Sequence, residues 1–135
     1  MHLRLISKGF YTVYAIAKTR EHCELLEFLE GLGQILQKDS DRMLALLDRV
    51  AIEGPPRITE ISHQIKGKLF EFIQGRLRVL WFYDEGRLII CTSGFVKKGQ
   101  KTPRREIDHA IQLMDAYFEE KKKHKYRYTE KKEPK

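Results

Sequence analysis

Two arginines, Arg76 and Arg78, are separated by one residue within a run that is rich in strand-forming side chains. Alternate side chains of a strand share a face, so these two guanidinium groups are expected to stand side by side. Like charges repel at this spacing, and an anion such as phosphate would relieve the repulsion. The alternative is that Glu71, on the neighbouring predicted strand, forms a cross-strand ion pair with one of them.

A second group of cations lies in residues 94–101, which connect the last predicted strand to the last predicted helix. Lys97, Lys98 and Lys101 lie in this connection, and Arg104 falls in the first turn of the helix. Backbone N–H groups and the positive end of the helix dipole also favour an anion there. The alternative interpretation is an exposed connector whose lysines are simply solvated.

The charge of the chain is concentrated in one region. Its 26 basic and 19 acidic residues give a net charge of +7. Residues 1–65 carry 8 basic and 9 acidic side chains, whereas residues 66–105, which include Lys66 and Lys68, carry 10 and 3. A segment with this excess is typical of a polyanion-binding site, although a solvated basic face remains the alternative.

Other chemistry has little support in the sequence. His63 is a candidate proton carrier, with an ordinary loop histidine as the alternative. The remaining histidines and the two cysteines, Cys23 and Cys91, lack the spacing of metal ligands. No glycine-rich nucleotide fingerprint is present. We therefore expect neither a metal nor a cofactor.

The sequence predicts both strands and helices as the elements that position these residues. Apolar residues make up 41% of the chain and charged residues 33%, as in a globular domain. Alternating patterns predict strands, and three-to-four spacing of apolar residues predicts helices. The strands are expected at 10–18, 69–73, 77–83 and 88–92. The helices are expected from Thr19 to about residue 32, from about Asp39 to Gly54, and from Thr102-Pro103 to Phe118, with Thr102 as N-cap.

These elements predict an α+β fold in the order β-α-α-β-β-β-α, with a helical hairpin and a C-terminal helix on one face of a mostly antiparallel sheet. Residues 1–120 form the single expected domain, and residues 121–135 a basic, flexible tail. Trp81 and its neighbours are expected in the core rather than stacked on bases. No stretch approaches the roughly 20 apolar residues of a membrane span, so we expect a cytoplasmic protein without membrane contact.

The sequence FVKKGQKTP at 95–103, taken with KGKLFE at 66–71 and LWFY at 80–83, resembles the phage-derived, HigB-like branch of the RelE toxin superfamily. The resemblance covers roughly residues 8–120. It implies a RelE-like fold and a type II toxin that cleaves mRNA without a metal, often in the ribosomal A site.

The resemblance also implies roles for particular residues. Arg78 matches an arginine of the family's aromatic strand, Lys97, Lys98 and Lys101 match its loop lysines, and Glu71 matches a glutamate of its Glu-Leu-Arg pattern. Two positions depart from the pattern, since Ile73 replaces the arginine and Ser93 a histidine. The implied reaction transfers a phosphodiester to the neighbouring 2′-hydroxyl, with either a lysine or Glu71 as base.

The implied partners are mRNA, the ribosome and a helix-turn-helix antitoxin, with a homodimer as a further possibility. Lys66, Lys68, Arg76, Lys97 and Arg104 are the expected RNA-binding residues, and Arg78, Lys98, Lys101 and Glu71 the expected catalytic ones. A non-catalytic RNA- or ribosome-binding module with the same fold is the alternative, and the two departures favour it. A third interpretation makes the basic face a docking surface for an acidic antitoxin.

Overall fold

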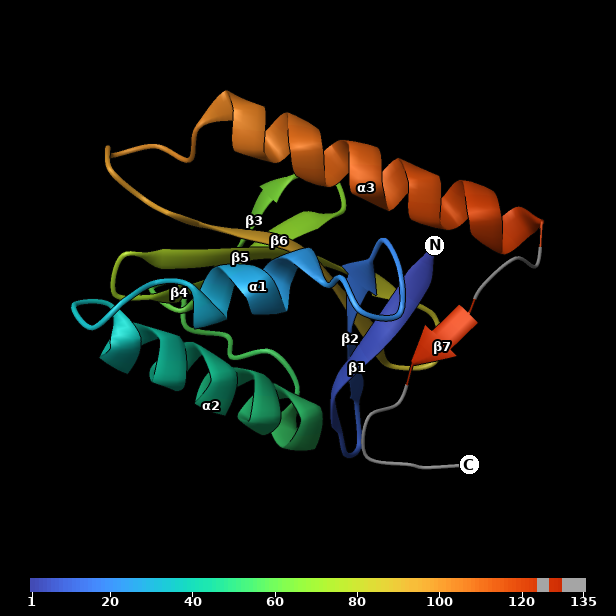
Figure 1. The fold of residues 1–135 in the computed structure, drawn as a ribbon, viewed down its shortest axis with the longest axis horizontal. Helices are drawn as coiled ribbons and strands as arrows, with labels where there is room; N and C mark the ends of the chain where they lie inside the picture. The colour runs from blue at the N-terminus through green and yellow to red at the C-terminus, as the bar shows by residue number, and fades with distance from the viewer. Residues whose placement is uncertain (124–126, 130–135) are drawn as a thin grey trace.

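The computed structural model describes residues 1–123 and 127–129, which form one curved sheet and three helices (Figure 1). In chain order the elements are β1 (His2–Lys8), β2 (Thr12–Ala17), α1 (Glu24–Glu30), α2 (Gln37–Glu53), β3 (Ser62–Lys66), β4 (Leu69–Gln74), β5 (Leu77–Asp84), β6 (Leu88–Val96), α3 (Arg104–Lys122) and β7 (Arg127–Thr129).

The sheet is mostly antiparallel, which confirms the predicted α+β class. Its strand order is β3-β4-β5-β6-β2-β1-β7. Strands β3 to β6 form an antiparallel meander, and β1 pairs antiparallel with β2. The two parallel pairs are β2 with β6 and β1 with β7. The first hairpin thus joins the meander along β6.

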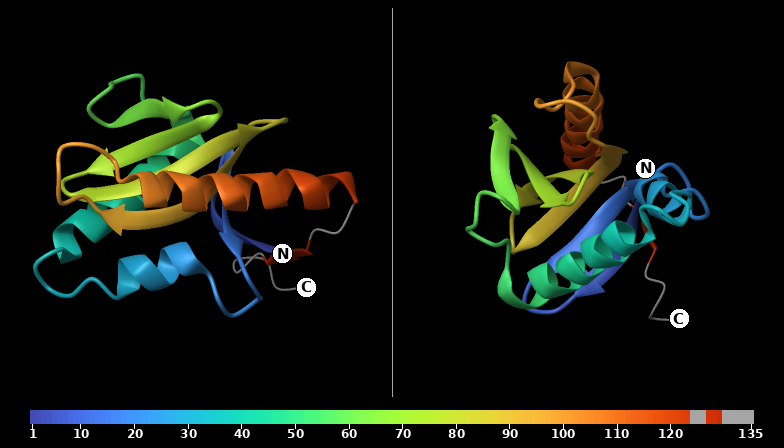
Figure 2. Two further views of the ribbon diagram at one scale, coloured as in Figure 1. Left: turned by 90° about the horizontal axis from the view of Figure 1, so that it is seen from above. Right: turned by 90° about the vertical axis from the view of Figure 1, so that its left-hand side faces the viewer.

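The helices cover both faces of the sheet, so the prediction that they share one face is wrong. Helices α1 and α2 lie on one side of the sheet and α3 on the other (Figure 2). Strand β5 explains this arrangement, because Val79 and Trp81 pack in the cluster beneath α1 and α2, whereas Leu80 and Phe82 pack against α3. A strand that is apolar on both faces needs cover on both.

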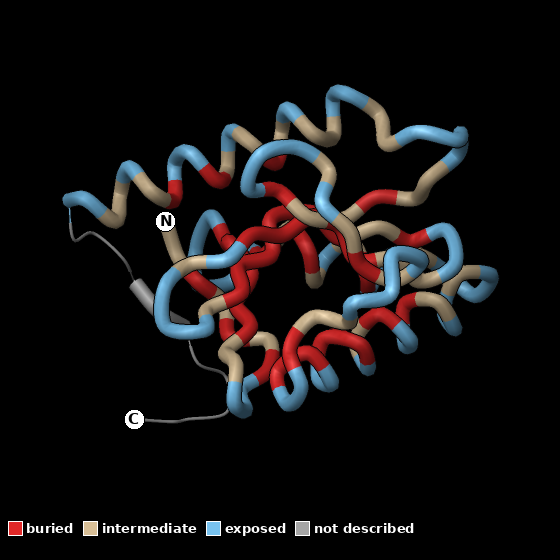
Figure 3. The backbone as a smooth tube through the Cα atoms, turned by 180° about the vertical axis from the view of Figure 1, so that it is seen from behind, coloured by how far each residue is buried: buried red, intermediate tan, exposed pale blue. Residues whose placement is uncertain are grey.

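Strands β1, β3 and β7 were not predicted from the sequence. Strand β1 alternates buried Leu3, Leu5 and Ser7 with more exposed residues, and its polar start conceals this pattern. Strand β3 lies at the edge of the sheet and holds His63, which the sequence placed in a loop. The predicted first strand at 10–18 is shorter and forms β2. The buried positions run through the centre of the sheet, with exposed residues on the turns (Figure 3).

Helix boundaries follow the sequence signals only in part. The end of α2 at Gly54 is confirmed, and its φ of 85° suits glycine. Helix α1 begins after Cys23 rather than at Thr19. Strand β6 extends through Val96, so the basic loop is shorter than predicted. Pro103, not Thr102, occupies the N-cap position of α3, which frees the threonine side chain for another contact.

The predicted tail at 121–135 is described only in part. Helix α3 continues to Lys122, and β7 adds a short strand beside β1. The other residues of this segment, 124–126 and 130–135, lie outside the described residues. Within 1–123 and 127–129, no helix is both long and apolar enough to cross a bilayer.

Candidate RNA-binding and cleavage site

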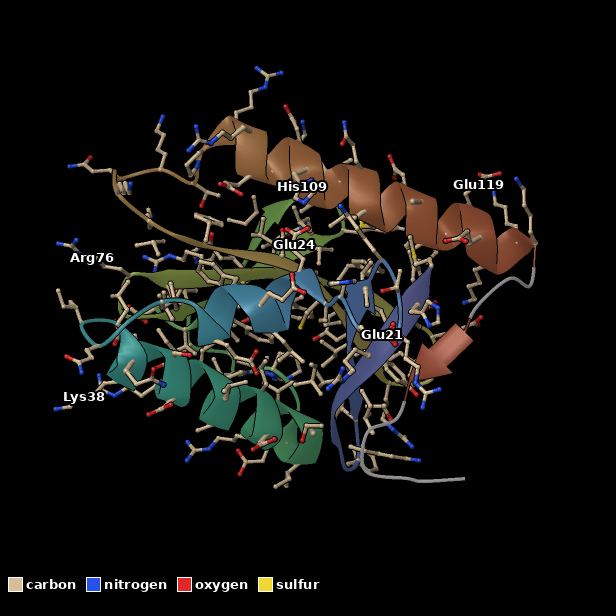
Figure 4. All side chains as sticks on the ribbon, viewed as in Figure 1. Glu21, Glu24, Lys38, Arg76, His109 and Glu119 are labelled. Carbon is tan, nitrogen blue, oxygen red and sulfur yellow. The ribbon has the colours of Figure 1, made fainter. Side chains whose placement is uncertain are left out.

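Four of the predicted cationic side chains border one hollow of about 360 Å³ at the end of the sheet where β4 turns into β5. The hollow lies between this turn and the loop that joins β6 to α3. Figure 4 shows Arg76 at this end of the sheet. The lining residues are Gly75, Arg76, Arg78, Lys97, Lys98 and Gly99. Arg76 in the turn, Arg78 on β5 and the two loop lysines therefore converge on one hollow.

Local backbone structure fixes the two sides of this hollow. The N–H group of Lys97 donates to the carbonyl oxygen of Arg76 at 2.8 Å, which ties the loop to the turn. Gly75 has a φ of 57°. A Cβ atom at this position would also lie 2.4 Å from a carboxylate oxygen of Asp39. The positive φ favours glycine in this turn, and a larger residue would also require the Asp39 side chain of α2 to move.

Arg78 is mostly enclosed, although it lines the hollow. Its side chain is 11% exposed. Its Nη1 donates to the carbonyl oxygens of Gly75 at 2.7 Å and Leu77 at 3.0 Å. Burial lowers the pKa of Arg78, and the charge of Glu71 opposes that change. Arg78 thus holds the turn together while it lines the hollow.

Glu71 lies behind the hollow, where it is 1% exposed. The hydroxyl of Thr102 donates to Glu71 Oε2 at 2.8 Å. His63 Nε2 lies 3.1 Å from Glu71 Oε1, and Arg78 Nε lies 3.8 Å from the same oxygen. One buried carboxylate therefore contacts β3, β5 and the segment that leads into α3.

Strand register explains the pairing of Glu71 with Arg78. Arg78 lies opposite Ile73, and Glu71 lies opposite Leu80, so the ion pair crosses the strands diagonally. Alternation places both side chains on the face of the sheet that α3 covers. The cross-strand ion pair, which the sequence offered as an alternative, is therefore present at 3.8 Å.

Two side chains of this cluster could not be assigned from the sequence. Thr102 precedes a proline, the signal of a helix cap, and only the fold brings its hydroxyl to Glu71. His63 is fixed on its other side as well, because Nδ1 lies 3.0 Å from the carbonyl oxygen of Thr59. Since a carbonyl only accepts, Nδ1 carries the hydrogen of this bond.

The remaining predicted RNA-binding residues do not line the hollow. Lys66 and Lys68 flank the turn before β4, and Gly75 follows its other end, about 20 Å away at the rise of a strand. Lys68 instead lies 5.4 Å from the ring centre of Phe118, near the far end of α3. The inference that closeness in sequence gathers these two lysines with the others is wrong.

Lys101 and Arg104 continue the basic surface beyond the hollow. Lys101 is an exposed residue of the loop before α3. Arg104 opens α3 with its side chain 89% exposed and 3.9 Å from Asp108. Neither residue lines the hollow itself.

The two departures from the family pattern also have defined places. Ile73 lies opposite Arg78, where an arginine would add a third strand cation. Ser93 is fully buried beside Leu80 and cannot exchange protons with a ligand in the hollow. Within the described residues, no cluster of three histidine, cysteine or acidic side chains could hold a metal ion.

The arrangement can bind phosphate groups and stabilise negative charge that develops on them. Guanidinium and ammonium groups from the turn before β5 and from the loop before α3 surround an open hollow. The buried carboxylate of Glu71 contacts both Arg78 and the end of this loop. Such preorganised positive charge is the main requirement for phosphodiester chemistry.

Comparison with known proteins places this geometry in a family. A sequence model described as Phage derived protein Gp49-like (DUF891) matches residues 28–115, which span the end of α1, all of α2, the meander, the basic loop and much of α3. The comparison with curated proteins finds no match. The chain belongs to the Gp49-like family of phage-derived proteins, within the RelE/HigB-like toxin superfamily.

Proposed function

We propose that this protein, a toxin of the RelE type by its family, is an endoribonuclease that cleaves mRNA and acts on the ribosome. The observation that carries the proposal is the convergence of Arg76, Arg78, Lys97 and Lys98 on one open hollow. Phosphate contacts dominate affinity for RNA, and these four cations provide them.

The proposed reaction forms a bond between the 2′-oxygen and phosphorus and breaks the bond between phosphorus and the 5′-oxygen. A base takes the proton of the 2′-hydroxyl, and an acid gives a proton to the departing 5′-oxygen. Arg78 stabilises the phosphorane charge. We assign the proton transfers to Lys98, which lines the hollow, and to Lys101 in the adjoining loop. The positive charge needed for this reaction comes from the protein itself.

Glu71 has a different role in this proposal from the general base that the sequence allowed. Its carboxylate is 1% exposed and is engaged by Thr102, His63 and Arg78. A ribose hydroxyl in the hollow would have to displace these partners. We therefore assign Glu71 as a positioning residue that acts through Arg78 and through the start of α3.

The family makes an antitoxin the expected partner, and we extend this to a helix-turn-helix antitoxin that covers the basic hollow. We also propose that the protein forms a homodimer and is located in the cytoplasm. A non-catalytic RNA- or ribosome-binding module is the second candidate, favoured by Ile73 and the buried Ser93, which remove two polar side chains from the site.

Single-turnover cleavage of ribosome-bound mRNA by the purified protein tests the proposal. We expect specific 5′ ends in the parent and their loss in the double variant Lys97→Ala/Lys98→Ala. Induced expression should arrest growth, and co-expression of the antitoxin should restore it. RNA binding without cleavage, on or off the ribosome, would establish the second candidate.

A further inference from the structure

A second hollow, of about 260 Å³, lies at the far end of β5 from the basic hollow. It opens between Tyr83 and the loop that follows α2. Trp81, which lines it, packs in the core cluster of α1 and α2, whereas Glu71 and Arg78 face α3. The aromatic wall of the second hollow therefore lies on the face opposite Glu71 and Arg78. His63, whose Nε2 lies 3.1 Å from Glu71 Oε1, also lines the second hollow, but the proposed reaction places no substrate there.

Aromatic rings form one wall of this second hollow. Trp81 is stacked between Phe70 and Phe72, with ring centres 4.8 and 4.6 Å away. Tyr83 stands nearly perpendicular to Phe70 and Trp81, at 78° and 80°. Trp81 is 1% exposed, but Tyr83 is 43% exposed. The buried stack thus holds Tyr83 in place while much of its surface stays open.

Charged groups border the same hollow. Arg57 extends from the loop after α2 and is exposed, and no ion pair engages its guanidinium among the described residues. Burial raises the pKa of Tyr83, Tyr11 raises it further, and the charge of Arg57 opposes both, so the guanidinium acts on this phenol. Glu53, at the end of α2, supplies a carboxylate to the lining.

This combination matches the parts of a nucleotide. An open aromatic ring offers a surface on which any base can stack. A guanidinium suits a phosphate, and a carboxylate accepts hydrogen bonds from the exocyclic amino group of a base. The fold does not require an exposed Arg57 beside the carboxylate of Glu53 and the ring of Tyr83.

We propose that the second hollow is a nucleotide-binding site in which a base stacks on Tyr83 while Arg57 contacts the phosphate. The site stands on its own geometry. If the bound nucleotide belongs to single-stranded RNA, this proposal rests on the proposed function. If a free nucleotide binds, it does not.

The single tryptophan of the chain provides the readout. Trp81 gives one indole N–H resonance, and this group has no hydrogen-bond partner among the described residues. We expect titration with at least one of the four ribonucleoside 5′-monophosphates to shift this resonance saturably. Ribose 5-phosphate, which lacks a base, should bind more weakly. The proposal is overturned if none of the four nucleotides shifts the resonance, or if ribose 5-phosphate binds as tightly as they do.

Variants locate the bound nucleotide. Tyr83→Leu should weaken binding about fivefold to a hundredfold, the range expected for a lost base–aromatic stack, and Tyr83→Phe should restore it. Arg57→Gln should weaken binding of the nucleotide, whereas Arg42→Gln, a matched change outside this hollow, should not. Circular dichroism checks the fold of each variant. Parental affinity in folded Tyr83→Leu would place the nucleotide elsewhere and refute the proposal.

A 2′-O-methyl oligoribonucleotide identifies the source, because it cannot be cleaved through its 2′-oxygen. A shift of the Trp81 resonance by this strand supports RNA as the ligand. A shift by mononucleotides alone supports a free nucleotide in the same site. Since neither arm measures cleavage, failure of this proposal leaves the endoribonuclease proposal standing, and the reverse also holds.

Discussion

The hydroxyl of Thr102 donates a hydrogen bond of 2.8 Å to the buried carboxylate of Glu71, and this bond joins the end of the basic loop to the second strand of the meander. Glu71 also contacts Arg78. The two sides of the basic hollow are therefore held by one side chain that is hidden from the ligand.

Removal of this hydroxyl should weaken the support of the loop. Thr102→Val keeps the shape of the side chain but leaves a buried carboxylate oxygen without its donor, a loss of about 1–3 kcal/mol in the free energy of unfolding. Urea denaturation followed by circular dichroism measures it. Thr19→Val, at an exposed threonine, should change stability by no more than about 0.5 kcal/mol.

A double-mutant cycle with Glu71→Gln extends this prediction to cleavage. If Glu71 acts through Thr102, the rate losses of the two single variants should not add in the double variant. Fully additive losses would mean that Glu71 reaches the reaction by another route, such as proton transfer.

Arg76 and Arg78 should differ in what they contribute. Arg78→Ala removes two hydrogen bonds to backbone carbonyl oxygens and the partner of a buried carboxylate. We expect it to lower stability by about 1–3 kcal/mol and the cleavage rate by roughly 10² to 10³. Arg76→Ala, at an exposed residue, should weaken RNA binding with stability unchanged. Thermal unfolding and single-turnover cleavage of both variants make the comparison, and equal stability of the two would contradict it.

RNA affinity should depend on salt chiefly through the four cations that line the basic hollow. Four phosphate contacts predict a slope of about −3 in log affinity against log salt for a single strand. Lys97→Ala/Lys98→Ala should reduce the magnitude of that slope by about 1.4. Lys66→Ala/Lys68→Ala should leave it unchanged, because these lysines lie beyond the other end of β4. Fluorescence anisotropy between low and moderate salt measures the slopes, and equal slopes for the two double variants would argue against the assigned site.

The acid stability of the protein should depend on the pairing of Asp84. Burial raises the pKa of Asp84, but hydrogen bonds from Lys121 and Tyr117 outweigh it and hold the pKa below 3.8. A lowered pKa stabilises the fold at pH values above 3.8, and this stabilisation is lost as the pH falls through the folded-state value.

Lys121→Met should therefore lower stability at pH 7 by at most about 1 kcal/mol. The difference from the parent should shrink as the pH falls below 3.8. Urea unfolding across this range gives the profile, with Lys122→Met as an exposed neighbour that should match the parent throughout. A difference that persists in acid would assign the effect of Lys121 to packing.

Strands β4 to β6 and the two long helices could be predicted from the sequence because local signals define them. Gly75 and Gly86 mark the turns between these strands, and β5 contains a continuous run of apolar residues. Strand β3 could not be predicted, since its sequence SHQIK has little apolar periodicity and its pairing with β4 defines it. The placement of helices on both faces follows from tertiary packing, which no single element encodes.

In the basic hollow, too, some contacts follow from local sequence and others only from the complete fold. Arg76, Arg78, Lys97 and Lys98 converge because a turn and a loop at one end of neighbouring strands must meet. Lys66 and Lys68 lie close in sequence but are separated from them by the length of a strand. Contacts of Glu71 with Thr102 and His63 join segments that only the complete sheet brings together.

The parallel pairing of β2 with β6 also determines when the fold can form. Thr12 lies beside Leu88, and Ala15 beside Cys91, so the hairpin that is synthesised first has no strand of the meander beside it until β6 has been made. The length-dependent part of closing so long a loop costs about 4 kcal/mol in entropy, which slows the docking of the hairpin onto the meander. The meander and its basic hollow can form from local contacts before this step. Assembly of the central sheet therefore waits for the last strand of the meander.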